Sequence, residues 1–167
     1  SNSKKVLEQV PSEKRAVEVD INGDLPQTKT LGIWWDSQAD VFQFNVKEFS
    51  GIFTKREFLK FVASVFDPLG FLAPVNFRAK VLIQEMWTRN LDWDENLSED
   101  LKTEVEKWCN ELKLIEGVKI GRCFEAKKGK IHIFTDASPL GYAAIAYRIS
   151  GENENCKANL IACKTKV

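Results

Sequence analysis

The sequence predicts an α+β fold in which a β-hairpin comes first, three helices follow and a three-stranded antiparallel meander comes last. Apolar and polar residues alternate within residues 30–46, which is the period of a strand. Apolar residues then recur every three or four positions over residues 54–115, which is the period of a helix. Alternation returns over residues 131–136, and with the apolar runs at 142–148 and 158–163 it predicts the meander.

The predicted hairpin consists of two strand-like runs, residues 30–35 and 41–46, joined by the loop 36–40. Its aromatic residues are Trp34, Trp35, Phe42 and Phe44. We favour a packed sheet face as the interpretation of these rings. A platform on which nucleic-acid bases stack is the functional alternative.

The segments around the hairpin carry weaker signals. Residues 4–10 predict a short helix that Pro11 ends. Residues 17–21 alternate like a strand and run into the turn pair Asn-Gly at 22–23. Residues 25–30 are expected to be a connector, and residues 121–129 a polar linker.

Each predicted helix has a start or stop signal. Thr54 and Glu57 form a capping box, in which the Thr54 hydroxyl accepts from the backbone of Glu57 and Glu57 reaches back to Thr54. Residues 67–70, Asp-Pro-Leu-Gly, end this helix, and Pro74 fits the first turn of the second. Ser98 caps the third helix. The apolar stripe of that helix comprises Leu101, Val105, Trp108, Leu112 and Ile115.

The meander has a carboxylate, Asp136, where its first strand is expected to run out. Residues 137–141 then form a turn, because Pro139 cannot extend a central strand and Gly141 tolerates a positive φ. The expected strands are residues 130–136, 142–148 and 158–163.

Such a meander leaves an open sheet edge, which is a site for aggregation or for pairing with a partner. Either the meander packs onto the helices of residues 54–116, or the native chain continues. His132 shares a face with Asp136, and a structural histidine is favoured there over a metal ligand.

The composition is that of a globular protein, with 167 residues, 44% hydrophobic residues and a formal net charge of zero. A global basic excess, the mark of a dedicated nucleic-acid binder, is therefore absent. The four cysteines fit no zinc pattern and are interpreted as reduced structural thiols. With no signal peptide and no bilayer-spanning run in the sequence, we expect a soluble intracellular protein.

Several stretches resemble the BEL/Pao family of LTR retrotransposon polyproteins. Residues 30–36, Thr-Leu-Gly-Ile-Trp-Trp-Asp, are similar to that family's hairpin after the polymerase palm. Residues 54–57 and 64–74, the latter containing Phe-Asp-Pro-Leu-Gly, resemble its thumb signature. Residues 134–138, Phe-Thr-Asp-Ala-Ser, resemble the opening of its ribonuclease H domain. Further similar stretches are residues 78–80, 84–87, 91–94 and 160–164.

The resemblance implies three modules. Residues 1–52 would be the end of the palm with a primer-grip-like hairpin, and residues 53–124 a helical thumb and connection region. Residues 125–167 would be the start of a ribonuclease H-like sheet. The implied partners are an RNA–DNA or primer–template duplex and the rest of the polyprotein, and no membrane. The expected location is the cytoplasm, with a virus-like particle or the nucleus as alternatives.

Candidate contacts with nucleic acid come from the hairpin and the helices. They are Trp34, Trp35, Lys55, Arg56, Arg78 and Lys80. Lys55 and Arg56 oppose the helix dipole in the first helical turn, which weakly suggests a partner phosphate. A solvated charged turn is slightly favoured for these two.

Asp136 is, by the resemblance, the first metal-binding catalytic carboxylate of a ribonuclease H, with magnesium expected in the complete parent enzyme. The alternative is a turn aspartate that caps its own loop. The polymerase palm and the later ribonuclease H carboxylates are absent from the sequence. We therefore expect no cofactor and no catalysis for the isolated chain, whereas the parent would be an RNA-directed DNA polymerase with ribonuclease H activity.

The sequence is compatible with two functions, one that involves nucleic acid and one that does not. The first is a non-catalytic segment of a retrotransposon polyprotein that handles the primer–template duplex. The second is a domesticated remnant that serves as a protein-interaction or structural module without binding nucleic acid. A small hydrolase is disfavoured by the missing carboxylates, and the sequence does not indicate an oligomeric state.

Overall fold

The computed structural model describes residues 4–11, 14, 27–30, 33–124, 128–151 and 156–167. The strand predicted at 17–21 and the turn at 22–23 lie outside these residues. The chain separates into two compact units, one formed by Ser1–Asn45 with Glu116–Phe124 and the other by Val46–Ile115 with Glu125–Val167. The predicted functional division into 1–52, 53–124 and 125–167 stays a prediction.

The first unit contains a four-stranded antiparallel sheet in the order β1-β2-β3-β4, together with a short helix. These elements are α1 (Lys4–Glu8), β1 (Gln27–Thr30), β2 (Ile33–Asp36), β3 (Val41–Gln43) and β4 (Lys119–Gly121). The predicted hairpin is therefore present as β2 and β3, and it gains a strand on each side. The segments expected to be a connector and a linker supply β1 and part of β4, which are too short for a periodic signal.

Three helices of the second unit are α2 (Lys55–Ser64), α3 (Ala73–Thr88) and α4 (Glu99–Lys113), and the short 3-10 helix η2 (Leu114–Gly117) follows. The Thr54 hydroxyl accepts from the Glu57 N–H at 3.3 Å, as predicted. The Thr54 N–H instead donates to the Ile52 carbonyl at 2.8 Å, so only one half of the capping box forms. Pro74 lies in the first turn of α3. Ser98 is the N-cap residue of α4 as predicted, but its side chain makes no capping hydrogen bond.

The core of the second unit lies under the predicted stripe of α4. Leu101, Val105, Trp108 and Leu112 are all buried. The Trp108 ring meets the Phe58 ring edge-on at 5.6 Å between centroids, and its Nε1–H donates to the Val75 carbonyl at 2.9 Å. One indole therefore joins α2, α3 and α4, and its polar atom is satisfied inside the core.

The meander is present as an antiparallel sheet in the order β5-β6-β7. Its strands are β5 (Lys130–Ser138), β6 (Gly141–Ser150) and β7 (Lys157–Lys166). The strands are longer than predicted, and only two residues separate β5 from β6. Asp136 consequently lies within β5, opposite Ala143, and not at the end of the strand. Gly141 has a φ of +153°, the positive value for which a glycine was expected.

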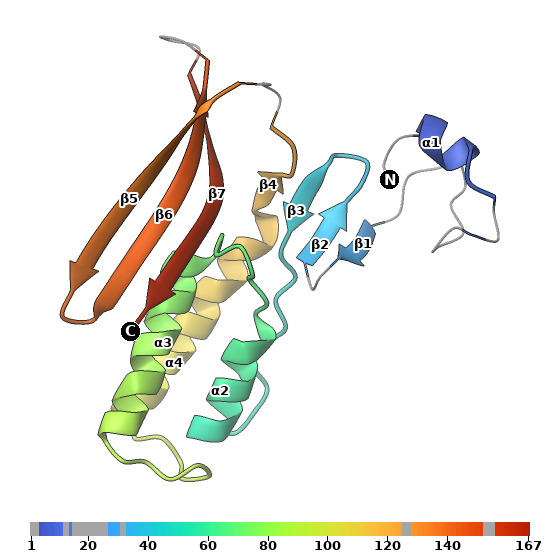
Figure 1. Ribbon diagram of the computed structural model, residues 1–167. Helices are drawn as coiled ribbons and strands as arrows, with labels where there is room; N and C mark the ends of the chain where they lie inside the picture. The colour runs from blue at the N-terminus through green and yellow to red at the C-terminus, as the bar shows by residue number, and fades with distance from the viewer. Residues whose placement is uncertain (1–3, 12–13, 15–26, 31–32, 125–127, 152–155) are drawn as a thin grey trace. The chain divides into compact units, whose positions relative to one another are not determined.

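The outer edge of β7 contacts the turn between α2 and α3, and Figure 1 shows β7 as the strand nearest α3. The Cys163 N–H donates to the Leu69 carbonyl at 2.8 Å. The Asp67 carboxylate accepts from the N–H groups of Phe71 and Leu72, each at 2.8 Å, and so fixes the turn ahead of α3. The predicted helix stop at 67–70 is thus also the junction between helices and sheet.

None of the helices in the described part of the chain combines the length and the hydrophobicity that crossing a bilayer requires.

Candidate nucleic-acid interface

Asp136 is exposed on β5, where it shares a face with His132 and Phe134. A pair of magnesium ions needs several carboxylate oxygens in fixed geometry. Among the described residues, no three or more histidine, cysteine, aspartate or glutamate side chains are placed to hold a metal ion. Asp136 with its described neighbours does not fit a pair of magnesium ions, so no metal-dependent step is assigned to it. The metal role of Asp136 in a complete parent enzyme stays a prediction.

Lys55 is buried, with 3% of its surface exposed, beneath two tryptophan rings. Its Nζ lies 4.0 Å from the Trp87 ring centroid and 5.0 Å from that of Trp93, and it donates to the Leu91 carbonyl. Cation–π attraction and a charge-assisted hydrogen bond therefore hold the ammonium inside the protein. Lys55, which opposes the helix dipole, is therefore paired inside the protein and is not solvated.

Arg56 is exposed and pairs with Asp94 in a two-point contact, Nε to Oδ1 at 2.7 Å and the second guanidinium nitrogen to Oδ2 at 3.0 Å. The hydrogen bond from Arg56 lowers the pKa of Asp94, and the same contact raises the pKa of Arg56. A phosphate that bound Arg56 would compete with this carboxylate.

Arg78 and Lys80 both project from α3 and contact other elements. Arg78 forms an ion pair with Glu111 of α4. The Lys80 Nζ donates to the Thr165 carbonyl at 3.2 Å and to its hydroxyl at 3.1 Å, which connects α3 to β7. The four helical cations of the predicted set thus make contacts within the chain, and their binding of nucleic acid stays a prediction.

Trp35 packs on the face of the first sheet that carries Phe42 and Ile120. Its Nε1–H donates to Asp40 at 3.0 Å, and the guanidinium of Arg122 lies 5.0 Å from its ring centroid. Partial burial opposes ionisation of Asp40, but hydrogen bonds led by that from Arg122 outweigh it and lower the pKa of this carboxyl. For Trp35 the contacts match the favoured interpretation, a packed ring.

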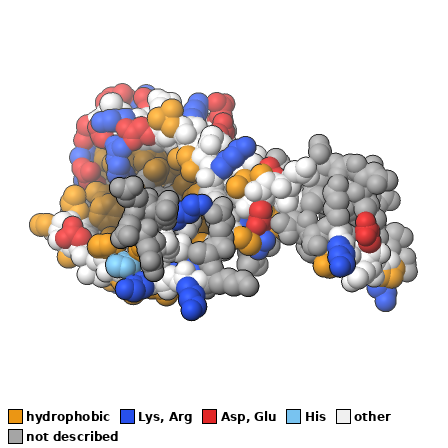
Figure 2. Space-filling model, turned by 90° about the horizontal axis from the view of Figure 1, so that it is seen from above, with side chains coloured by type: hydrophobic (Ala, Val, Ile, Leu, Met, Phe, Trp, Pro, Cys, Tyr) orange, Lys and Arg blue, Asp and Glu red, His pale blue; other side chains and the backbone are white. Residues whose placement is uncertain are grey.

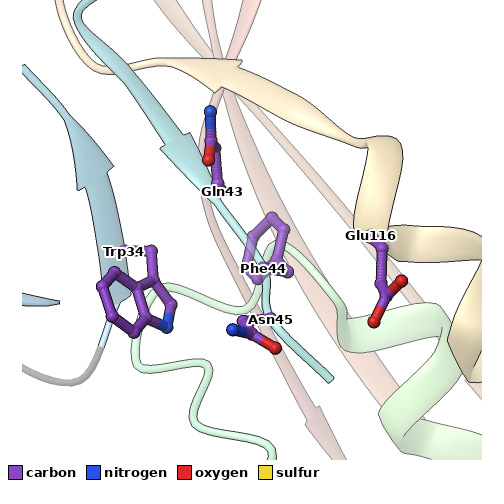
Figure 3. A pocket seen from close by; sticks show the side chains of 5 residues that line it. All are labelled: Trp34, Gln43, Phe44, Asn45 and Glu116. Carbon is purple, nitrogen blue, oxygen red and sulfur yellow. The ribbon is translucent and has the colours of Figure 1, made fainter. Parts of the chain in front are cut away.

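Trp34 lies on the opposite face and lines a hollow of about 330 Å³. The other lining residues are Gln43, Phe44, Asn45 and Glu116. In Figure 3, the indole and the Glu116 carboxylate flank the segment that carries Phe44 and Asn45. The hollow therefore combines two aromatic rings, two amides and one carboxylate.

A row of side chains crosses three strands at this hollow. Gln43 is the register partner of both Trp34 on β2 and Lys119 on β4. Directly opposite residues of an antiparallel sheet share a face, so the indole, the amide and the exposed Lys119 lie in line. A flat ring for stacking and a cation for a phosphate are the two elements of single-strand recognition.

Sequence reasoning found Trp34 but missed Gln43, Asn45, Glu116 and Lys119. Nothing in the sequence signals that β4 pairs with β3, because the two strands are three residues long each and α2 to α4 lie between them. The alternation of Val118, Lys119 and Ile120 is compatible with a strand, but it does not indicate which strand would be its partner.

Comparison with known proteins gives one finding. A family model described as the Pao retrotransposon-like RNaseH-like domain matches residues 54–167, which include α2 to α4 and the whole β5–β7 sheet. No curated protein and no solved structure gave a significant match. The match covers more than half of the sequence, and the chain belongs to this family of Pao retrotransposon polyproteins.

Proposed function

We propose that the chain is a non-catalytic, nucleic-acid-handling segment of its retrotransposon polyprotein and that the hollow at Trp34 receives an unpaired base of the primer–template. The observation that carries this proposal is the row of Trp34, Gln43 and Lys119 across β2, β3 and β4.

Stacking supplies the affinity for a base. Trp34 is only half-buried, so part of its ring remains accessible beside the hollow. A hollow of about 330 Å³ is within the size range of small-ligand sites. Each base stacked on an aromatic ring contributes about 1–3 kcal/mol, largely independently of sequence.

The polar lining determines which edge of a base fits. The amides of Gln43 and Asn45 can each donate and accept, whereas the Glu116 carboxylate only accepts when ionised. Glu116 therefore favours a base edge with an amino group and repels phosphate. Lys119, exposed on the same face, offers the nearby cation for the backbone.

The helices contribute less to this proposal than the sheet. A duplex that bound Arg56 would have to displace Asp94, and one that bound Arg78 would have to displace Glu111. Lys55 is buried and so is not accessible to a phosphate. In the proposed arrangement residues 53–124 lie beside the duplex as a thumb and connection region, held together by these internal ion pairs.

The test is equilibrium binding of the whole chain to a labelled RNA–DNA primer–template with a single-stranded template overhang, measured over a range of salt concentrations. Trp34→Ala should weaken binding by about 10-fold to 100-fold, and Trp34→Phe should recover part of the loss because a ring remains. Lys119→Gln should reduce the slope of log affinity against log salt concentration by about the amount expected for one phosphate contact. Lys107→Gln, an exposed lysine on α4, is the matched control and should bind like the wild type.

Equal affinities of wild type and Trp34→Ala would contradict the base site. A flat salt response of the wild type would contradict the whole proposal, since phosphate contacts release counterions. The second function, a protein-interaction module, would then take precedence.

A further inference from the structure

Glu116 brings a negative charge to the lining of the hollow at Trp34, and its carboxylate has two oxygens that only accept hydrogen bonds. Other carboxylates of the chain are paired with cations, as Asp94 is with Arg56. Figure 2 shows Lys and Arg side chains next to Asp and Glu side chains over part of the surface. Within the described residues, Glu116 forms neither an ion pair nor a side-chain hydrogen bond. Both of its oxygens are therefore available to a ligand.

Gln43 adds a further acceptor to the hollow. Its Nε2 donates to the Asp36 carboxylate at 3.4 Å, which leaves the amide oxygen for a ligand. In Figure 3 this oxygen lies on the side of Phe44, and the nitrogen points away from it. The exposed Asn45 can both donate and accept. The polar side chains of the hollow thus offer mainly acceptors, which suits a ligand rich in N–H donors.

We infer that the unpaired base received by the hollow is guanine, an inference that rests on the base site proposed above. Guanine presents N1–H and its 2-amino group side by side, and these two donors match the two oxygens of the Glu116 carboxylate. The neighbouring O6 of guanine can accept from the Asn45 amide. Adenine and cytosine each present an amino group beside a ring nitrogen that accepts, and uracil presents one N–H between two carbonyls. None of these three bases can make the two-point contact.

Stacking on Trp34 does not by itself select guanine, because adenine has a ring system of the same size. The carboxylate supplies the discrimination, and it also disfavours a free nucleotide. A terminal phosphate carries about two negative charges, whereas each phosphate within a strand carries one. Lys119, in line with Trp34 and Gln43, offers a cation for a strand that passes the hollow. The occupant is therefore a guanine within a strand.

The test measures binding of the whole chain to labelled RNA–DNA primer–templates whose template overhang consists of abasic sites around one base. That base is guanine, adenine, cytosine, uracil or hypoxanthine. Guanine should bind about tenfold more tightly than adenine. Hypoxanthine keeps the N1–H but lacks the 2-amino group, so its affinity should fall between those of guanine and adenine.

Glu116→Gln removes the charge and replaces one acceptor by a donor, so the two-point contact is lost. Its preference for guanine over adenine should fall to within about twofold, and adenine itself should bind no more weakly than to the wild type. Glu104→Gln, an exposed carboxylate on α4, is the matched control and should keep the full preference. Circular dichroism should show that both variants retain the fold.

Equal affinities of the wild type for guanine and adenine would overturn the guanine assignment while leaving the stacking site of the proposed function intact. A preference that persists in Glu116→Gln would do the same. If no base binds better than an overhang made only of abasic sites, the assignment and the base site both fail. Competition tests the source of the guanine. GMP that displaces the labelled strand as effectively as the unlabelled guanine strand does would overturn a strand as the occupant.

Discussion

Gly70 shows how one residue in a family-like motif controls the contact between helices and sheet. Its φ is +73°, a conformation that side chains rarely adopt. A Cβ at this position would lie 1.8 Å from the Cys163 carbonyl oxygen and 2.6 Å from its carbon. The Phe-Asp-Pro-Leu-Gly stretch that resembles a thumb signature is therefore needed here for close packing against β7.

Substitution of Gly70 by alanine should destabilise the second unit strongly. Backbone strain at a positive φ and displacement of β7 both contribute, and we expect a loss of about 3 kcal/mol. Denaturant unfolding of the chain measures it. Gly117→Ala is the matched control, because a Cβ there meets nothing within 4 Å, and its effect should stay within about 0.5 kcal/mol. Equal midpoints for the two variants would contradict this account of Gly70.

The helical cations show why residue roles were harder to predict than residue positions. Lys55 and Arg56 were recognised as unfavourable for the helix dipole, and that observation was sound. Their partners, the Leu91 carbonyl and the Asp94 carboxylate, lie in a loop far along the sequence. A sequence pattern reports a missing partner, but it does not say whether that partner is internal or a bound ligand.

Among the elements, the end of α3 and the start of α4 are joined by a charged contact. Arg89 caps the C-terminus of α3 and pairs with Asp100 in the first turn of α4 at 2.7 Å. A cation at a helix C-terminus and an anion at a helix N-terminus both complement the helix dipoles. Hydrogen bonds from Ser98 and then Arg89 lower the pKa of Asp100 to about 2.

This contact should make the stability of the chain depend on pH in the acidic range. Because the pKa of Asp100 is about 2 when folded and about 3.9 when unfolded, its stabilising effect is complete above about pH 4 and is lost as the pH falls toward 2. Asp100→Asn should therefore lower the Tm at neutral pH, and the difference from wild type should shrink as the pH falls from 4 to 2. Glu104→Gln, an exposed carboxylate on the same helix, is the control. A Tm difference that stays constant with pH would argue against the contact.

For the whole molecule, we predict that the purified chain does not cleave an RNA–DNA hybrid in the presence of magnesium. Asp136 is a single exposed carboxylate, and two-metal hydrolysis needs several oxygen ligands held together. A gel assay with a labelled hybrid measures cleavage, and Asp136→Asn is the control for contaminating nuclease. Cleavage that requires both magnesium and Asp136 would show this prediction to be wrong.

Much of the fold followed from local chemistry. Periodicity and capping rules correctly predicted the stop at 67–70, Pro74, the position of Ser98 and the stripe of α4, because each of these acts over a few residues. The α+β order of hairpin, helices and meander was confirmed. The four-stranded sheet was missed because β3 and β4 are brief and distant in sequence. Trp34, Gln43, Phe44 and Asn45 of the hollow lie in the predicted hairpin. Glu116 and Lys119 belong to the segment that pairs through β4, so this part of the site could not be predicted from the sequence.

The hydrogen bond from Cys163 to Leu69 has a consequence for how the chain reaches its native state. The helices and the meander are each built from contacts between neighbours in sequence, and such contacts form quickly. Joining these two blocks closes a long loop and is entropically slower. As the chain is synthesised, the helices with the Asp67–Gly70 turn emerge before β7. The contact between Leu69 and Cys163 can therefore form only after the helices have been available to fold.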